Sequence, residues 1–171
     1  IVVGGVEASL RRIAHYDAWS NRVRRSILID AKADLLVYGM GEKTVLELAG
    51  RLKEGRAVSD LRGLCHIAAE KEPGMVELPS YEKAAADPSA FTEMFLGFYR
   101  NQGHRTAQAL CQRQDSRWLI HNPPMPPLTE AEMDGVHRMD FERDVHPYDR
   151  RRGKVRALET IRFSIPTHRG C

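Results

Sequence analysis

Apolar residues form short runs and regularly spaced positions in the first third of the chain. Residues 1–3 are an apolar run that predicts a buried strand, and Gly4-Gly5 follows it as a turn. Apolar side chains at spacings of three, four and four residues predict a helix over 16–27. The run at 35–38 predicts a second strand, and the periodic residues 45–52 predict a second helix. This order of strand, helix, strand and helix is typical of an α/β protein with a parallel sheet.

The middle of the chain has weaker patterns. Residues 64–68 and 75–78 are two candidate strands, joined as a pair through a turn at Pro73-Gly74. A stripe of Phe and Met side chains predicts a helix over 91–98, and helical spacing continues over 107–111. We therefore expect strands and helices to mix in this part.

The last part of the chain contains one strong local signal. Residues 118–120 are a candidate strand, and the proline-rich run 122–127 must be extended because proline fixes φ and lacks an N–H donor. Thr129 and Glu132 have the spacing of a capping box, which predicts the start of a short helix. Alternating side chains predict a strand over 161–165.

Composition excludes several classes of protein. Hydrophobic residues make up 42% of the 171 residues, which is typical of a globular chain. Lys plus Arg exceed Asp plus Glu by 26 − 23 = 3, too little to indicate nucleic-acid binding by itself. The apolar runs are far shorter than the roughly 20 residues of a membrane span, and three cysteines are too few for a disulfide framework. We therefore expect a cytoplasmic protein with neither membrane nor nucleic acid as a partner.

Basic side chains are concentrated between residues 11 and 32, where six basic residues stand against two acidic ones, a net charge of 6 − 2 = +4. Such a stretch can hold phosphates or acidic partners. The favoured interpretation is a solvated face or pairing within the molecule, in which the arginines at 24–25 pair with Asp30 or Asp34.

The histidines and cysteines show no C-x-x-C or H-x-x-x-H spacing, which argues against a zinc site. Cys65 and His66 would point to opposite faces of a strand, the wrong arrangement for a nucleophile and its base. Cys65 and Cys111 are therefore predicted to be small core residues. Cys171 follows Arg169-Gly170 beyond the last predicted strand, a setting that suits metal ligation or nucleophilic chemistry. One cysteine alone holds no iron–sulfur cluster, so the residues by themselves favour an ordinary terminal cysteine.

Two glycine turns follow predicted strands, at the carboxyl ends where open α/β sheets bind ligands. They are Gly4-Gly5 and Gly39-Met40-Gly41-Glu42. A backbone without Cβ atoms suits a phosphate, a ribose or a flat cofactor edge. The second turn begins like a G-x-G-x-x-G fingerprint, but Thr44 stands in place of the third glycine, which argues against a dinucleotide site. The alternative is that these glycines only permit tight strand-to-helix turns.

Several segments carry a more specific pattern, in order along the chain. They are VGGVEASLRRIAHYD at 3–17, DAKADLLVYGMGE at 30–42, LPSYE at 78–82, NPP at 122–124, Met133-Asp134, His146-Pro147, ETIRFS at 159–164 and HRGC at 168–171. Together they resemble the YgiQ-type (UPF0313) radical S-adenosylmethionine proteins. The first forty residues are the most specific part, and the middle is patchy.

The resemblance implies a cofactor and a role for Cys171. In that family an Arg-Gly-Cys is followed by two further cysteines in a C-x-x-x-C-x-x-C loop. The three thiolates hold a 4Fe-4S cluster, S-adenosylmethionine chelates the fourth iron, and an electron from the cluster releases a 5′-deoxyadenosyl radical. By position Cys171 corresponds to the first ligand. S-adenosylmethionine, a substrate we do not name and an electron donor are thus the partners implied for a longer parent protein.

The resemblance also implies a domain organisation. Residues 1–57 resemble the second half of a cobalamin-binding-like α/β domain, 58–154 a partly helical connecting insertion, and 155–171 the first strand of a radical-enzyme (β/α) barrel. No D-x-H-x-x-G signature is present, which makes cobalamin doubtful. The candidate cofactor-binding residues come from the two turns and the first resembling segment: Gly4, Gly5, Glu7, Gly39, Gly41 and Glu42.

We expect the chain to be an internal fragment of such an enzyme, because it opens within a predicted strand and ends on Cys171. Two of the three cluster cysteines are absent from it, so the chain alone should be inactive. The alternative is a non-catalytic α/β module that binds a nucleotide or a corrinoid at the two turns.

Overall fold

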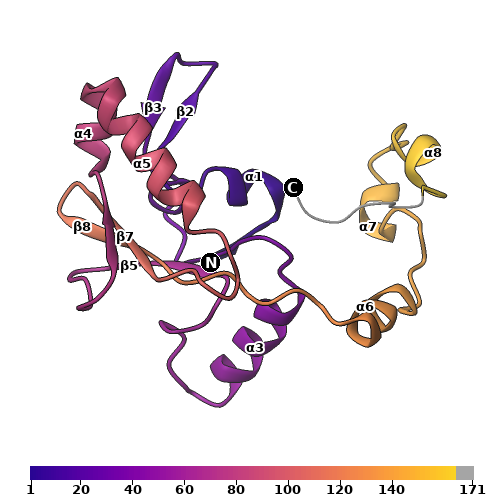
Figure 1. The fold of residues 1–171 in the computed structure, drawn as a ribbon. Helices are drawn as coiled ribbons and strands as arrows, with labels where there is room; N and C mark the ends of the chain where they lie inside the picture. Colours follow the sequence, from indigo (N-terminus) through magenta and orange to yellow (C-terminus); the bar gives the residue numbers. More distant parts are fainter. Residues whose placement is uncertain (165–171) are drawn as a thin grey trace. The chain divides into compact units, whose positions relative to one another are not determined.

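The computed structural model describes residues 1–164, which form a six-stranded mixed sheet, a two-stranded antiparallel sheet and the connecting helices (Figure 1). The strands are β1 (Val2–Val3), β2 (His15–Asp17), β3 (Arg22–Arg24), β4 (Leu35–Val37), β5 (Leu64–Ala68), β6 (Val76–Leu78), β7 (Leu110–Gln114) and β8 (Arg117–His121). The helices are α1 (Gly5–Leu10), α2 (Ile27–Asp30), α3 (Glu42–Lys53), α4 (Tyr81–Ala86), α5 (Pro88–Arg100), α6 (Glu130–His137), α7 (Pro147–Arg150) and α8 (Leu158–Ile161). The predicted α/β class is confirmed.

The large sheet has the strand order β1-β4-β5-β8-β7-β6. Its outer junctions, β1 with β4 and β6 with β7, are parallel, whereas the three inner junctions are antiparallel. The predicted parallel sheet is therefore correct only in part. Val37 at the end of β4 pairs with Leu64 at the start of β5. After α3 the chain must therefore return to the end of the sheet where β4 finished, and β5 starts from that end. This return makes β4 and β5 antiparallel.

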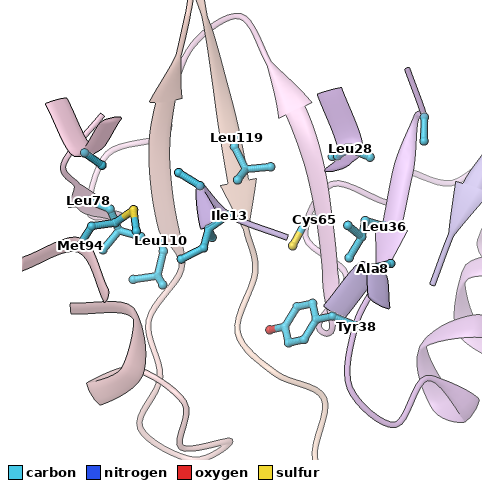
Figure 2. Close-up of a cluster of buried hydrophobic side chains, with 13 residues drawn as sticks. Ala8, Ile13, Leu28, Leu36, Tyr38, Cys65, Leu78, Met94, Leu110 and Leu119 are labelled. Atoms are coloured by element: carbon cyan, nitrogen blue, oxygen red, sulfur yellow. The ribbon is translucent and has the colours of Figure 1, made fainter. Parts of the chain in front are cut away.

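The main core lies between one face of the sheet and helices α1, α2, α4 and α5 (Figure 2). Its buried side chains come from both layers: Ala8, Ile13, Ala14, Leu28, Ala33, Leu36, Tyr38, Cys65, Leu78, Ala84, Met94, Leu110 and Leu119. Because successive side chains of a strand point to opposite faces, the neighbour Val37 turns to the other side. There it packs with Leu48 of α3 and Leu64 in a second, smaller cluster.

Two buried glutamines on β7 tie surrounding loops to the sheet. The Gln112 side chain accepts a hydrogen bond from the N–H of Ala14 and donates one to the Pro79 carbonyl, both at 2.9 Å. Gln114 accepts from the N–H of Ser26 and donates to the Gln112 oxygen, again at 2.9 Å. Buried polar groups require hydrogen-bond partners. The two glutamine side chains provide such partners for backbone groups in segments that lie outside the helices and strands.

The helix predicted from Tyr16 onward is wrong, because β2 and β3 form a hairpin in which Tyr16 lies opposite Val23. The carboxylate of Asp17 makes the turn. It accepts hydrogen bonds from the N–H groups of Trp19 and Ser20 and from the Ser20 hydroxyl. A seven-residue separation places two side chains on one helical face or opposite each other across a short hairpin. The apolar spacing alone did not distinguish these structures.

Two predictions for the middle of the chain are also corrected. The candidate strands exist as β5 and β6, but they do not pair with each other, since β6 pairs with β7 at the far edge of the sheet. The helical spacing over 107–111 does not continue α5, because this part enters strand β7. The side chain of Asn101 bonds to both backbone groups of Gln108, at 2.7 and 3.0 Å. These two bonds close the loop that ends the helix and turns the chain toward β7.

The chain divides into two compact units, Ile1–Pro127 and the part from Leu128 onward. Strands from both sides of residue 57 belong to the one large sheet. The domain assignments to 1–57, 58–154 and 155–171 stay predictions.

The part from Leu128 to Ser164 carries the three short helices α6, α7 and α8. The predicted capping box is confirmed at the start of α6. The Thr129 hydroxyl accepts from the N–H of Glu132, and the Glu132 carboxylate accepts from the N–H of Thr129 at 2.7 Å.

The strand predicted over 161–165 is wrong where the structure describes it. Helix α8 ends at Ile161, and no strand follows it up to residue 164. A strand needs a hydrogen-bonded neighbour, and the described residues beyond 127 contain none, whereas a helix satisfies its own backbone. The remainder of the predicted barrel strand, with Cys171, lies outside the described residues.

Candidate functional site

The two glycine turns lie next to each other at one edge of the large sheet. Strands β1 and β4 are parallel neighbours, so their carboxyl ends, each followed by a turn, are at the same edge. The N–H of Gly39 in the second turn donates a hydrogen bond to the hydroxyl of Ser9 on α1, at 3.1 Å. The fold thus brings together the candidate residues of both turns at the kind of edge where open sheets bind ligands.

Each glycine of these turns also has a structural reason to be glycine. Gly5 and Gly39 have φ values of +87° and +71°, in the left-handed region that other residues rarely adopt. Gly4 and Gly41 pack against the end of β4, and a Cβ on Gly41 would lie 2.8 Å from a methyl carbon of Val37. Tight turns and close packing therefore account for all four glycines. Their role in ligand binding stays a prediction.

The two acidic candidates have different surroundings. Glu7 is exposed on α1 and forms an ion pair with Arg11 one turn later, at 2.7 Å. Glu42 is the first residue of α3 and is half-buried beside Gly41. A carboxylate at a helix N-terminus is favoured by the helix dipole, but it repels a phosphate that approaches the same backbone N–H groups. The second turn is consequently better suited to a hydroxyl or amino group of a ligand than to a phosphate.

A partly buried cluster next to the turns was missed by the sequence reasoning; its Tyr38 and His121 are buried and its Arg12 is half-buried. The guanidinium of Arg12 lies between the rings of Tyr38 and Phe98, 4.7 and 4.5 Å from their centroids. Its Nε donates to Nε2 of His121 at 3.0 Å, and a second N–H donates to the carbonyl of Ser9. The His121 ring also stacks on Tyr38, with centroids 4.5 Å apart. Arg12 and His121 are 109 positions apart, and no spacing in the sequence connects them.

Burial sets the protonation of this cluster. It lowers the pKa of His121 to about 3, with the positive charge of Arg12 as a further cause. Since Nε2 accepts a hydrogen bond, the ring proton is assigned to Nδ1, which is buried and has no hydrogen-bond partner among the described residues. The Tyr38 hydroxyl donates to the Asn122 carbonyl at 2.6 Å, and burial raises its pKa. Neither side chain titrates near pH 7, so the cluster is a clamp on Arg12 and not an acid–base pair.

Cys65 and Cys111 are confirmed as buried core residues with free thiols. Burial raises the pKa of Cys65 to about 12 and also raises the pKa of Cys111. Both thiols are therefore protonated at neutral pH and are poor ligands and nucleophiles. Within residues 1–164, no three His, Cys, Asp or Glu side chains are placed to hold a metal ion. The described residues thus do not fit an iron–sulfur cluster, and Cys171 is not one of them.

The basic stretch is largely paired within the molecule, as the favoured interpretation predicted. Arg24 lies 3.3 Å from Asp30, and Arg25 lies 3.1 Å from Asp30 and 2.5 Å from Asp115. Asp34, the other predicted partner, binds the N-terminal amine instead. These ion pairs reduce the positive charge that the stretch offers to a phosphate.

Two hollows in the Ile1–Pro127 unit lie away from the glycine turns. One, of about 430 Å³, is bordered by Ser80 at the start of α4 and by Arg113 on β7. The other, of about 220 Å³, is bordered by His66 and Asn122. Neither is lined by a candidate residue of the turns. Among the helices of residues 1–164, none is both long enough and apolar enough to cross a membrane.

The chain is similar to bacterial proteins named UPF0313 protein. The one from Fusobacterium nucleatum is 50% identical over 171 residues, that from Geobacter sulfurreducens 48% over 177, and that from Thermotoga maritima 46% over 175. Each match covers 100% of this chain but only 30%, 29% and 31% of the respective relative. The chain therefore spans less than a third of the length of these relatives. No solved structure matches it.

The family described as Radical SAM N-terminal matches residues 1–164, which are all the residues that the structure describes. The match and the relatives agree with the resemblance seen in the ordered motifs of the sequence. The chain belongs to the radical SAM N-terminal family.

Proposed function

We propose that this chain is the N-terminal part of a radical S-adenosylmethionine protein that carries a 4Fe-4S cluster, with Cys171 as one of the cluster ligands. The family match over residues 1–164 is the observation that carries the proposal, because Cys171 follows that region closely. When bound, a cluster of this kind supplies the electron that cleaves S-adenosylmethionine to a 5′-deoxyadenosyl radical. S-adenosylmethionine, an unidentified substrate and an electron donor are the partners of the full-length protein in this proposal, and its location is cytoplasmic.

The described residues have a supporting role in this proposal. Cys65 and Cys111 are committed to the core as protonated thiols, which leaves Cys171 as the available cysteine of the chain. The remaining ligands must then come from the rest of the full-length protein, since a cluster requires three or four.

The test uses the full-length protein, reconstituted with iron and sulfide without oxygen. We expect about four irons per protein and production of 5′-deoxyadenosine from S-adenosylmethionine. C171A should lose the cluster and the product, whereas C111A, which removes a buried thiol of the same type, should keep both. Iron content near zero in the wild-type protein would overturn the proposal, and so would an unchanged cluster in C171A.

A second candidate function is binding of a nucleotide or a corrinoid at the paired turns. It is supported by the parallel pairing of β1 with β4, after whose carboxyl ends the two glycine turns follow. A ligand at 100 times its dissociation constant should stabilise the protein by roughly 2.7 kcal/mol. Thermal unfolding with ATP, S-adenosylmethionine and cobalamin measures this directly. The absence of a shift with all three would exclude the second function.

A further inference from the structure

The part of the chain from Leu128 to Ser164, here called the strap, contains no buried side chain among its described residues. It carries eight basic and eight acidic residues, a net charge of 8 − 8 = 0. Its large apolar side chains that stand exposed are Met139, Phe141, Tyr148, Val155, Ile161 and Phe163. Phe163 is 77% exposed and Phe141 57%. Exposed apolar side chains that lie together in one patch are typical of a surface that another protein surface covers.

The helices of the strap are too short to be held by their backbone alone. They have eight, four and four residues, whereas isolated helices shorter than about 12 residues are marginal in water. On α8, Leu158 and Ile161 are three positions apart and share one face. With Phe141 they form the apolar part of the lining of a hollow of about 370 Å³, which Arg143, Asp144 and Arg162 also border. The strap thus presents an apolar helix face and a recess. Packing of another protein surface against them would stabilise the short helices.

Local polar contacts occupy much of the rest of the strap. The capping box fixes the start of α6. Arg150 pairs with Asp144, and Lys154 pairs with Glu159. The hydrogen bond from the Val145 N–H, followed by the contact with Arg150, holds the pKa of Asp144 below its usual value. These contacts satisfy polar groups within the strap, whereas side chains such as Phe141 and Ile161 stay exposed.

We propose that the strap docks, through these apolar side chains, on the part of the full-length protein that follows residue 171. The relatives are more than three times as long as this chain, and the strap is the region nearest in sequence to that remainder. A covalently joined partner is present at high effective concentration. Over its whole length the strap has no net charge, and its exposed apolar side chains favour an apolar protein surface as the partner. This inference rests on the proposed function in one respect, because it assumes that the part of the full-length protein after residue 171 is a folded domain.

Hydroxyl-radical footprinting of the full-length protein tests the docking. Reactivities are calibrated within the Ile1–Pro127 unit, where Trp19 is 95% exposed and Tyr38 and Met94 are buried. We expect Phe141 and Phe163 to react as slowly as the buried pair. Reaction near the rate expected from their exposure in the present structure would overturn the proposal. Protection that is lost when the protein is diluted from dimer to monomer would also overturn it, since the cover would then be a second copy.

Limited trypsin digestion of variants locates the docking surface. Arg150, Arg151 and Arg152 are exposed cleavage sites within the strap, and docking should make them slow to cleave. F141D should speed cleavage at these sites at least tenfold. F95D makes the same chemical change at a side chain of α5 that is 50% exposed, and should leave the rate within twofold of wild type. Equal rates for the two variants would contradict docking through Phe141, and footprinting of the wild type decides the question if F141D does not fold.

A third variant separates this inference from the proposed function. C171A should lose the cluster while its strap stays protected, because docking depends on apolar contacts and not on the cluster. Loss of protection in C171A would show that the strap is ordered by the cluster and would overturn the inference. An iron-free wild-type protein with a protected strap would overturn the proposed function alone.

Discussion

The unit Ile1–Pro127 and the strap differ in where their side chains find partners. In the first unit, apolar side chains from helices and strands meet in two cores, and even the polar side chain of Gln112 is buried and hydrogen-bonded. In the strap, the strongest local signal of the chain, the capping box of α6, begins a helix that buries no side chain. A strong local signal therefore predicts that an element forms, but not that the element has a core to pack on.

The core of the first unit and the strap should differ most in their response to the loss of an apolar side chain. Leu36 is fully buried in the sheet, whereas Ile161 of the strap is 57% exposed. Leu36→Ala should lower the free energy of unfolding by about 2–5 kcal/mol, because it leaves a cavity in a packed core. Ile161→Ala should change it by less than about 0.5 kcal/mol in the isolated chain. Urea unfolding followed by circular dichroism measures both, and similar losses would show that the strap has a core of its own.

The second prediction concerns the polar groups inside the first unit. Gln112→Leu keeps the side-chain volume but leaves the N–H of Ala14 and the carbonyl of Pro79 without their partner. Each orphaned buried group costs about 1–3 kcal/mol, so urea unfolding should show a loss within that range or above it. Gln102→Leu, at an exposed position, is the matched control and should be nearly neutral. A neutral Gln112→Leu would mean that the glutamines do not hold the loops.

The free energy of unfolding should depend on pH through His121. The folded pKa of His121 is about 3, below the ordinary 6.5, so between these values the unfolded chain binds a proton that the folded chain does not. Stability should therefore fall as the pH is lowered from 6.5, by about 1.4 kcal/mol per pH unit for this one group, or about 2 kcal/mol at pH 5. His121→Gln should flatten the dependence. His15→Gln should flatten it less, because His15 is only half-buried although its pKa is also lowered by burial. Equal slopes for wild type and His121→Gln would contradict the buried neutral imidazole.

The fourth and smallest effect lies in the strap. Thr129→Ala removes the cap of α6 and should destabilise that helix by about 1 kcal/mol. The unfolding of the Ile1–Pro127 unit should not change, since the helix contributes no buried side chain. Amide hydrogen exchange over α6, together with urea unfolding of the whole chain, separates the two effects. A coupled loss in both measurements would show that the strap stabilises the first unit.

Local pattern was sufficient for several elements of the fold. The strands β1 and β4, the helices α3 and α5, the capping box and the buried positions of Cys65 and Cys111 were predicted correctly. The predicted burial of residues 1–3 is wrong, because β1 is the edge strand of the described sheet and Val2 is 49% exposed. The pairing of arginines 24 and 25 with Asp30 was also foreseen. In each case the information lies within a few residues, as with a cap, an ion pair between near neighbours or the period of an apolar face.

The candidate site was predicted only as two separate turns. That they lie at the same end of the sheet follows from the parallel pairing of β1 with β4. The Arg12–His121 clamp beside them was not predicted at all, because its members come from distant segments. Nothing in the sequence around Arg12 indicates that its guanidinium will contact two aromatic rings.

The sequence by itself determined where helices begin, which residues form an apolar face and to which family the chain belongs. Only the tertiary structure decided that Tyr16 and Val23 face each other in a hairpin, that β6 joins β7 and not β5, and that the turns share an edge. The physical reason is the reach of the backbone hydrogen bond. A helix closes its bonds within four residues, so neighbouring side chains specify it. A strand takes its partners from anywhere in the chain, and burial depends on every segment at once.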